Sequence, residues 1–521
     1  MLVFAGVMLA MLLAALDQTI VATALPTIAT DLHGLEHLSW VVTAYLLTST
    51  IMVPIYGKLS DLYGRRMLFL VAITIFLIGS ALSGLAHSMT QLIAFRGLQG
   101  LGAGGMLPLA LATIGDLFSA RERGRYAGYT GAVFASASII GPLLGGYLTD
   151  SVSWRWIFYI NLPLGALALL VIGTRMQLPF QRREHRVDYL GAAILSAAVL
   201  CLLFVAVWGG TTYPWASPEV IGLAVAGAAL LVVFVWAERR ASEPVIPLQL
   251  FRDSIFNVTS MTALLLAVAI FGAIVYIPLF MQKVTGASAT NSGIVLMPLM
   301  LGWVVTSVTA GQLVSRTGRY KIYPIIGSVI MSFGFYLLTR LNASSSSGTA
   351  VRDMVIIGMG MGFVFQVYLV AMQNSVRADQ MGISTATVQF FRSIGATFGV
   401  AAFGTLLFAR LGSELAHRLG PAARHVDVQA IVNAPGRLPP AIGHDLRLSL
   451  ATSLHVVFVA TLGVAVVASL FSLILKERPL RTTSNVAAAL ASEVGPVAEE
   501  GAQQAAGATA GRPAPARSAR T

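Results

Sequence analysis

Fourteen apolar runs, each long enough to cross a lipid bilayer, recur along most of this 521-residue chain. About 30 Å of hydrocarbon takes roughly 20 helical residues to cross, and an unpaired backbone group inside that layer is costly. Only 11% of the residues are charged, against about 25% in soluble domains. The sequence therefore predicts an all-helical membrane protein. We expect its spans at residues 2–24, 39–57, 67–86, 89–113, 126–148, 156–175, 188–208, 219–237, 254–281, 292–314, 322–339, 352–374, 387–409 and 449–474.

A short internal repeat divides the chain. Residues 57–66 read GKLSDLYGRR and residues 311–321 read GQLVSRTGRYK, and both segments follow an even-numbered span. Chance similarity between arginine-rich loops is the alternative, but the matching positions favour two related halves. The predicted parts are an N-terminal six-helix bundle (1–175), a linker with two extra spans (176–253), a C-terminal six-helix bundle (254–475) with an outside loop (411–448), and a disordered tail (476–521) whose removal should be tolerated.

The basic residues predict which side of the membrane each loop faces. Twenty of the 34 Lys and Arg residues fall in the loops after even-numbered spans or just after span fourteen, and only four fall in the short loops on the other side. Because basic loops remain in the cytoplasm, we expect both termini there. The net charge of +12 then reflects topology, and it does not indicate a nucleic-acid partner.

Several other classes of protein are excluded. The lone Cys201 offers neither a disulfide nor a thiolate metal site. GLGAGG at 100–105 matches a dinucleotide-binding pattern, but it lies inside an apolar span without a preceding strand. The histidines show no ligand spacing. We therefore predict a protein that is not an enzyme and that needs no cofactor or metal.

Five motifs in the expected order resemble those of the major facilitator superfamily. The loop motif GKLSDLYGRR is joined by LIAFRGLQGLGAGG (92–105) and by IIGPLLGG (139–146), which resembles the span-five motif of antiporters. LDQTIVATALP (16–26) and WRWIFYINLP (154–163) resemble elements of the fourteen-span drug:proton antiporter branch. The resemblance covers roughly residues 1–475 and implies a major facilitator fold with fourteen transmembrane helices.

Asp17 and Arg96 are the predicted proton-coupling residues. Asp17 is the one acid that we place well within a span, where a carboxylate must be either protonated or paired. Arg96 cannot lose its proton and needs a counter-charge, and the resemblance implies that it takes part in coupling. We hypothesise that Arg96 stabilises ionised Asp17 in one conformation. The structural alternatives are a carboxylate bonded to a neighbouring helix and an arginine that anchors a helix end.

Two groups of residues are predicted to control movement of the helices. By resemblance, the first group forms a gating loop on the cytoplasmic side, although anchoring by positive charge explains its arginines equally well. Proline and glycines in span five predict a hinge or sliding surface. The gating loop contains Gly57, Asp61, Gly64, Arg65 and Arg66, and the hinge contains Gly141, Pro142, Gly145 and Gly146.

The substrate cavity is predicted only from polar or adaptable side chains placed at mid-span. These are Tyr45, Met297, Gln366, Gln389 and Arg392. Arg392 either attracts an anionic or polar group of the substrate or is paired structurally, and the sequence does not decide between these. The absence of an acid well within spans ten or thirteen argues against a preference for dicationic drugs.

Together these features predict a proton-coupled antiporter. We expect a monomer in a bacterial cytoplasmic membrane that exports a small amphipathic drug or antibiotic, with protons and lipid as its other partners. A transporter of a natural metabolite such as a siderophore or lipid is the first alternative, and a membrane sensor or scaffold that transports nothing is the second.

Overall fold

The computed structural model describes residues 2–33, 37–177, 188–210, 212–285, 296–342, 345–419 and 440–481. Within these ranges fourteen helices are long and apolar enough to cross a membrane. The prediction of fourteen spans is therefore confirmed.

The helices follow the predicted order. The N-terminal half contains α1 (Leu2–Asp31), α2 (Leu38–Tyr63), α3 (Arg65–Gly84), α4 (Met89–Leu117), α5 (Ala120–Ser151), α6 (Trp156–Tyr159) and α7 (Asn161–Arg175). Two inserted helices follow, α8 (Tyr189–Trp208) and α9 (Pro218–Glu238). After the short 3₁₀ helix η2 (Leu248–Arg252), the C-terminal half contains α10 (Ser254–Lys283), α12 (Met297–Thr317), α13 (Ile322–Thr339), α14 (Ser347–Ser375), η3 (Ala378–Gln380), α15 (Met381–Leu419) and α17 (Pro440–Leu473).

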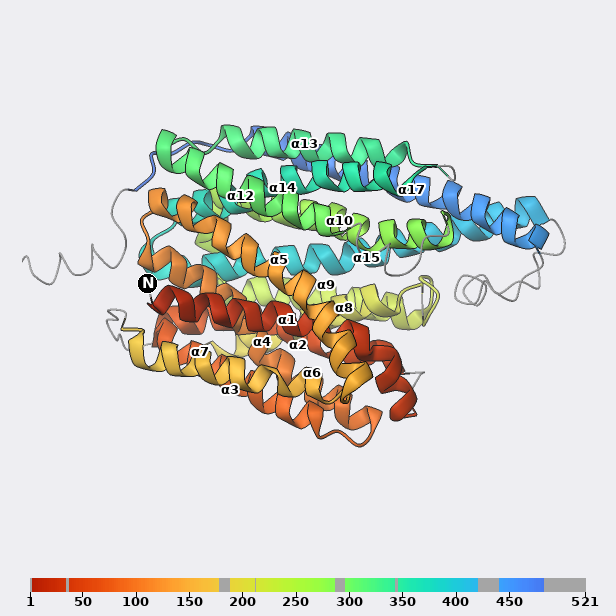
Figure 1. The fold of residues 1–521 in the computed structure, drawn as a ribbon. Coiled ribbons are helices and arrows are strands. Elements are labelled where there is room, and N and C mark those ends of the chain that lie inside the picture. The colour runs from red at the N-terminus through yellow and green to blue at the C-terminus, as the bar shows by residue number, and fades with distance from the viewer. Residues whose placement is uncertain are drawn as a thin grey trace, which may run out of the picture.

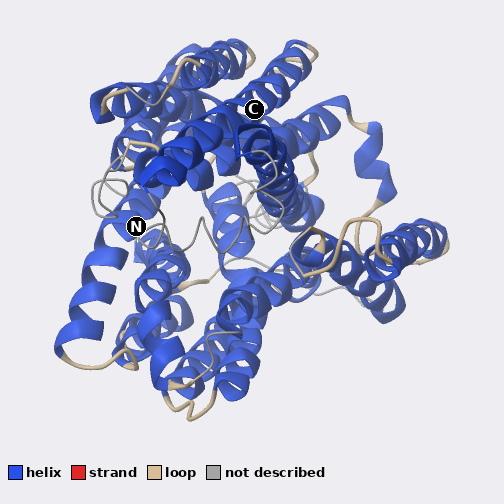
Figure 2. Ribbon diagram, turned by 90° about the vertical axis from the view of Figure 1, so that its right-hand side faces the viewer, coloured by secondary structure: helices blue, strands red, loops and turns tan. Residues whose placement is uncertain are grey.

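The two halves lie side by side, each around an apolar core of its own (Figure 1). The core of the C-terminal half runs from Ile255 to Leu475, and that of the N-terminal half runs from Phe4 to Met176. The halves meet along α2 with α15 and along α5 with α12. Seen along the helices, they form two bundles (Figure 2).

The inserted helices pack beside the junction of the two halves. α8 contacts both α2 and α15, and a third apolar cluster joins residues of α8 and α9 to α2, α14 and α15. The loop after α9 also joins this cluster through Val245 and Ile246. An ion pair of 2.7 Å between Lys58 Nζ and Glu243 Oε2 ties the same loop to α2. The inserted segment therefore touches both halves.

The internal repeat has a counterpart in the backbone. Gly64 ends α2 with φ +88°, and Gly318 ends α12 with φ +70°. Each is the eighth residue of its repeat segment, and glycine tolerates such positive φ values without a steric penalty. Leu2 and the end of the described chain near Arg481 lie at this same end of the molecule (Figure 1).

Several helices extend beyond the predicted spans. α14 begins at Ser347 instead of 352, so Asp353 lies within a helix and is fully buried. The sequence had suggested that Asp17 is the only acid well within a span. Asp353 is a second acid that is buried within a helix. α15 continues to Leu419 and α17 starts at Pro440, so helix replaces both ends of the predicted outside loop, and residues 420–439 lie outside the described part.

The first six residues of the predicted tail, 476–481, are held against the body. The Tyr320 hydroxyl donates to the Lys476 carbonyl (2.9 Å) and accepts from the backbone N–H of Arg478 (2.8 Å). Arg478 pairs with Asp253 at 2.8 Å, and the Asn374 amide bonds the chain on both sides of Leu480. Burial raises the pKa of Tyr320, which keeps its hydroxyl protonated as a donor.

We expect a chain that stops at Leu475 to be less stable than one that stops at Arg481. The shorter chain loses the hydrogen bonds of Tyr320 and Asn374, and each such bond contributes about 0.5–1.5 kcal/mol. Thermal unfolding of the two purified proteins in the same detergent measures the difference. Equal unfolding temperatures would show that this segment does not stabilise the fold.

Candidate functional site

Asp17 lies at the centre of a buried polar network in the N-terminal half. Its Oδ2 accepts a hydrogen bond of 2.7 Å from Arg96 Nη1, and its Oδ1 accepts from Gln99 Nε2 (2.8 Å) and Asn161 Nδ2 (3.0 Å). Arg96 Nη1 also donates to Gln99 Oε1 at 2.7 Å. The side chains of Asp17, Gln99 and Asn161 are fully buried, and that of Arg96 is 2% exposed. The two predicted coupling residues are thus in direct contact.

Sequence reasoning missed Gln99, Asn161 and Ser80 as members of this network. Gln99 follows Arg96 by one helical turn on α4, and Asn161 is the first residue of α7. Ser80 of α3 accepts from Asn161 Nδ2 (3.0 Å) and donates to the Phe158 carbonyl (2.8 Å). Gln99 and Asn161 both lie within recognised motifs, LIAFRGLQGLGAGG and WRWIFYINLP, which was the available signal.

Tyr45 belongs to this network rather than to the substrate cavity. Its ring lies 4.1 Å from the Arg96 guanidinium, and the ring of Phe158 lies 5.8 Å away on the same cation. An aromatic face attracts a cation most strongly where water is excluded. Tyr45 is 1% exposed and does not line the cavity described below, where the sequence had placed it.

The network suits an ionised carboxylate. Both oxygens of Asp17 accept hydrogen bonds from N–H groups. These groups are donors only, so they could not accept a hydrogen bond from a protonated carboxyl group. A buried ion pair is stable only when its geometry and its additional hydrogen bonds offset the loss of water. If Asp17 were protonated here, Arg96 would remain charged without its counter-ion.

The glycines of α5 pack directly against the helix that carries Asp17. A Cβ atom at Gly141 would come within 2.8 Å of Thr19 Cβ, and one at Gly145 within 2.6 Å of the Ile20 carbonyl oxygen. Gly146 would meet nothing within 4 Å, and Pro142 is exposed in an unbroken helix. The close surface is therefore formed by Gly141 and Gly145, and Gly146 faces away because each residue turns the helix by about 100°.

We expect Gly145→Ala to be destabilising and Gly146→Ala to be tolerated. The added methyl group at 145 must push α1 away from α5, and overpacking of this kind costs about 1–3 kcal/mol. Thermal unfolding and transport rate, measured for both variants, give the comparison. If the two substitutions have the same effect, the α1–α5 contact is not the reason for the glycines.

Asp61 joins the two halves at the end that bears the α2–α3 turn. It lies in the last turn of α2, not in a loop as predicted. Its two carboxylate oxygens accept hydrogen bonds from the backbone N–H groups of Gly382 (2.9 Å) and Ile383 (2.8 Å) at the start of α15. First-turn N–H groups have no partner within their own helix, and a helix N-terminus attracts negative charge. Asp61 therefore caps a helix of the opposite half.

The other predicted gating residues surround this contact. Arg65 pairs with Asp61 (2.7 Å) and with Asp116 at the end of α4 (3.0 Å). Gly57 lets α2 approach α15, since a Cβ there would lie 3.1 Å from the Gly382 carbonyl oxygen. Arg66 instead donates to the Gly173 carbonyl within the N-terminal half. The structure brings Gly57, Asp61 and Arg65 to the junction and leaves Arg66 away from it.

Further contacts close the same end, and sequence reasoning did not select them. Arg121 at the start of α5 donates to the Ser315 carbonyl (2.6 Å), and Ser315 is the repeat counterpart of Asp61. Gln373 of α14 accepts from Arg123 (3.3 Å) and donates to the Leu111 carbonyl (3.1 Å). Burial lowers the pKa of Arg123 to about 10, which still leaves it charged at neutral pH.

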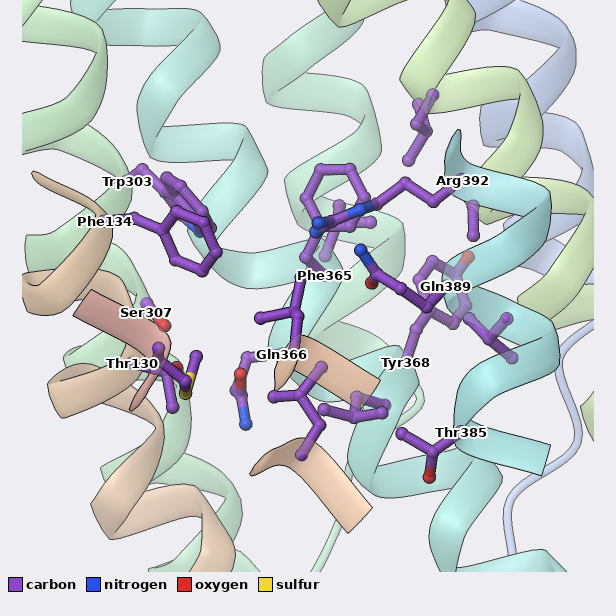
Figure 3. Close-up of a pocket in the computed structure, with 18 residues that line it drawn as sticks. Thr130, Phe134, Trp303, Ser307, Phe365, Gln366, Tyr368, Thr385, Gln389 and Arg392 are labelled. Carbon is purple, nitrogen blue, oxygen red and sulfur yellow. The ribbon is translucent and has the colours of Figure 1, made fainter. Parts of the chain in front are cut away.

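A cavity lies between the halves and is lined by residues of both (Figure 3). Gln366, Gln389 and Arg392 line it, as predicted. Phe134 and Trp303 face each other across the α5–α12 contact, with ring centroids 5.8 Å apart. The remaining lining is mostly apolar, apart from a few hydroxyl groups, and consists of Met11, Leu107, Leu111, Thr130, Ala263, Leu266, Ser307, Val364, Phe365, Tyr368, Leu369, Thr385 and Val388.

Met297 does not join this cavity. It is the first residue of α12 rather than a mid-span residue, because the helix begins five residues later than the predicted span and residues 286–295 are outside the described part. Among the residues that the structure describes, no group of three His, Cys, Asp or Glu side chains could hold a metal ion.

Two six-helix bundles with a cavity between them and a contact that joins them at one end are the architecture of a membrane transporter. The Major Facilitator Superfamily model matches residues 7–188 and 177–400. The multidrug transporter protein MdtP of Bacillus subtilis is 39% identical over 91% of this chain and 93% of its own length. Multidrug resistance protein 3 of the same organism is 36% identical over 92% and 96%.

A solved structure of the proton:xylose symporter XylE is similar in fold, with a TM-score of 0.62 and 14% identity over 93% of this chain and 97% of that one. The chain belongs to the Major Facilitator Superfamily. It is a multi-span membrane transporter rather than an enzyme.

Proposed function

We propose that this transporter is a proton-coupled antiporter that exports drugs or antibiotics across a bacterial cytoplasmic membrane. Its similarity to two transporters named for multidrug resistance, over nearly the full length of each, supports drugs as the cargo. The observation that carries the proposal is the buried contact between Asp17 and Arg96. A carboxylate held in this way can bind and release a proton only if the helices around it move.

In this proposal the described structure is the state with ionised Asp17. Protonation from outside removes the charge that holds Arg96 Nη1 at 2.7 Å, so α1 and α4 are released from each other. The α1–α5 contact at Gly141 and Gly145 lets α1 slide against α5. The cavity lining includes Met11 on α1, about 9 Å along the helix from Asp17, so movement of α1 changes both sites.

The contact between Asp61 and α15 supplies the gate. In the described structure it closes the end that the basic loops predict to be cytoplasmic. Movement after proton uptake opens this end for the drug, and release of the proton to the cytoplasm restores the ion pair. Each positive charge that enters contributes about 2.3 kcal/mol per 100 mV of membrane potential.

Transport by purified protein in lipid vesicles tests the proposal. The panel contains ethidium as a cation, chloramphenicol as a neutral compound and dansyl-phenylalanine as a carboxylate, with a pH-sensitive dye on the opposite side. We expect proton movement opposite to the flux of at least one compound. Transport of a panel compound without proton movement would indicate a uniporter. If no panel compound is transported but a natural metabolite is, the protein is a metabolite transporter.

A further inference from the structure

Arg392 is an embedded cation without a protein counter-ion. It lies on α15, ten residues after Gly382, which places it about 15 Å along the helix from the Asp61 contact and near the middle of a 30 Å hydrocarbon layer. In the described part of the chain its side chain has no hydrogen bond or ion pair. Its contact is the face of Phe365, with 5.8 Å between the guanidinium carbon and the ring centroid.

Arg392 is partly exposed, whereas the arginines of the bundle that are more deeply buried have polar partners within the protein. Arg123 donates to the Phe118 carbonyl and to Gln373. Arg96 meets Asp17 at 2.7 Å, and Arg65 meets Asp61 and Asp116 at 2.7 and 3.0 Å. An unpaired charge at this depth is costly, so such a residue faces a water-filled cavity, which an ion from outside can also enter. Arg392 meets that condition because it lines the central cavity.

The surroundings of Arg392 restrict what this ion can be. No carboxylate lines the cavity among the described residues, and the polar lining consists of hydroxyl groups, Gln366 and Gln389. Gln389 lies beside Arg392, one helical turn earlier, and both side chains point into the cavity (Figure 3). The planar guanidinium fits a carboxylate with two parallel hydrogen bonds, while Phe134, Trp303 and Phe365 offer apolar and aromatic surface for the rest of a ligand.

We propose that the cavity selects amphipathic anions: an aromatic or apolar body that carries one carboxylate, with the carboxylate on Arg392. The inference rests on the proposed function, because it assigns a substrate class to that same cavity. It also has an electrical consequence. An anion that leaves while protons enter moves positive charge inward on both counts, so the membrane potential drives export of an anion more strongly than export of a neutral compound.

Binding of two matched fluorescent probes tests the inference. Dansyl-phenylalanine carries a carboxylate, and dansyl-phenylalanine amide has the same body without the charge. We expect the purified full-length protein to bind the acid at least about tenfold more tightly than the amide, as a charge-assisted hydrogen bond predicts. Equal affinity for the two probes would overturn the proposal.

Three substitutions connect this preference to Arg392. Arg392→Gln should weaken binding of the acid about tenfold or more and leave binding of the amide unchanged, and Arg392→Lys should retain much of the preference. Arg377→Gln is the matched control, because Arg377 lies on the same half but is exposed and pairs with Asp379. If Arg392→Gln still prefers the acid, Arg392 is not the anion site.

A fourth substitution keeps the test decisive if Arg392→Gln fails to fold. Gln366→Glu places a carboxylate in the same cavity and should lower affinity for the acid but not for the amide. Unchanged affinity for the acid would count against the proposal. The vesicle panel tests the proposed function separately. Proton-coupled transport of ethidium alone would refute selection of anions but would support antiport. Transport without proton coupling would refute antiport, whichever probe the protein binds more tightly.

Discussion

Asp17→Asn is expected to abolish proton-driven export. Asparagine keeps the size of the side chain but cannot gain or lose a proton, so drug movement no longer depends on the pH gradient. It also leaves Arg96 buried without its counter-charge, and breaking a buried pair on one side costs about 3–5 kcal/mol of stability. Transport in vesicles with an imposed pH gradient measures the first effect, and thermal unfolding in detergent measures the second.

The double variant Asp17→Asn with Arg96→Gln separates coupling from stability. It removes both charges, so most of the lost stability should return, as expected for two residues in direct contact. Coupling should remain absent, because no titratable group has been restored. If the double variant regains proton-driven export, the Asp17–Arg96 contact is structural and the proposed mechanism is wrong. Full activity of Asp17→Asn alone would favour the sensor or scaffold.

Asp61→Asn is expected to open the end of the molecule that carries the α2–α3 turn. The carboxylate holds two first-turn N–H groups of α15 at 2.8 and 2.9 Å and also pairs with Arg65. Loss of a hydrogen bond to a charged group costs about 1.5–3 kcal/mol, which is roughly a 10- to 150-fold shift between the closed and open states. Spin labels on Tyr63→Cys and Arg319→Cys, in a Cys201→Ser background, report the distance between the halves.

We expect one short distance in the parent protein and an added longer one in Asp61→Asn. Arg66→Gln is the control, since Arg66 bonds Gly173 of its own half and not α15. A longer distance of the same size in Arg66→Gln would show that any change in the basic loop disturbs the gate. An unchanged distance in Asp61→Asn would remove Asp61 from the gate.

Hydropathy and the repeat predicted the number and order of the helices because the bilayer sets the length of a span and the backbone must be hydrogen-bonded within it. The ends of helices were harder to predict. Asp61 was assigned to a loop and Asp353 to the very start of a span because charged residues lower hydropathy, yet Asp61 lies in the last turn of α2 and Asp353 in the second turn of α14. Residues 476–481 contain no apolar run, so nothing local in the sequence indicates their contacts with Tyr320 and Asn374.

The charged residues of the site could be identified from the sequence because a charge inside a span requires a reason. Their neutral partners could not. Gln99 and Asn161 resemble ordinary polar residues of membrane helices until the fold brings them within 3.0 Å of Asp17. Tyr45 was assigned to the cavity from its mid-span depth alone. Depth does not show which face of a helix a residue occupies, and the partner of Tyr45 is Arg96.

Proton flux driven by substrate alone tests the central claim most directly. Vesicles with equal pH on both sides contain a pH-sensitive dye, and a compound transported in the panel is supplied as a gradient. We expect its downhill flux to move protons in the opposite direction in the parent protein, and Asp17→Asn to move no protons. Proton movement that persists in Asp17→Asn would place the coupling group elsewhere and contradict the account.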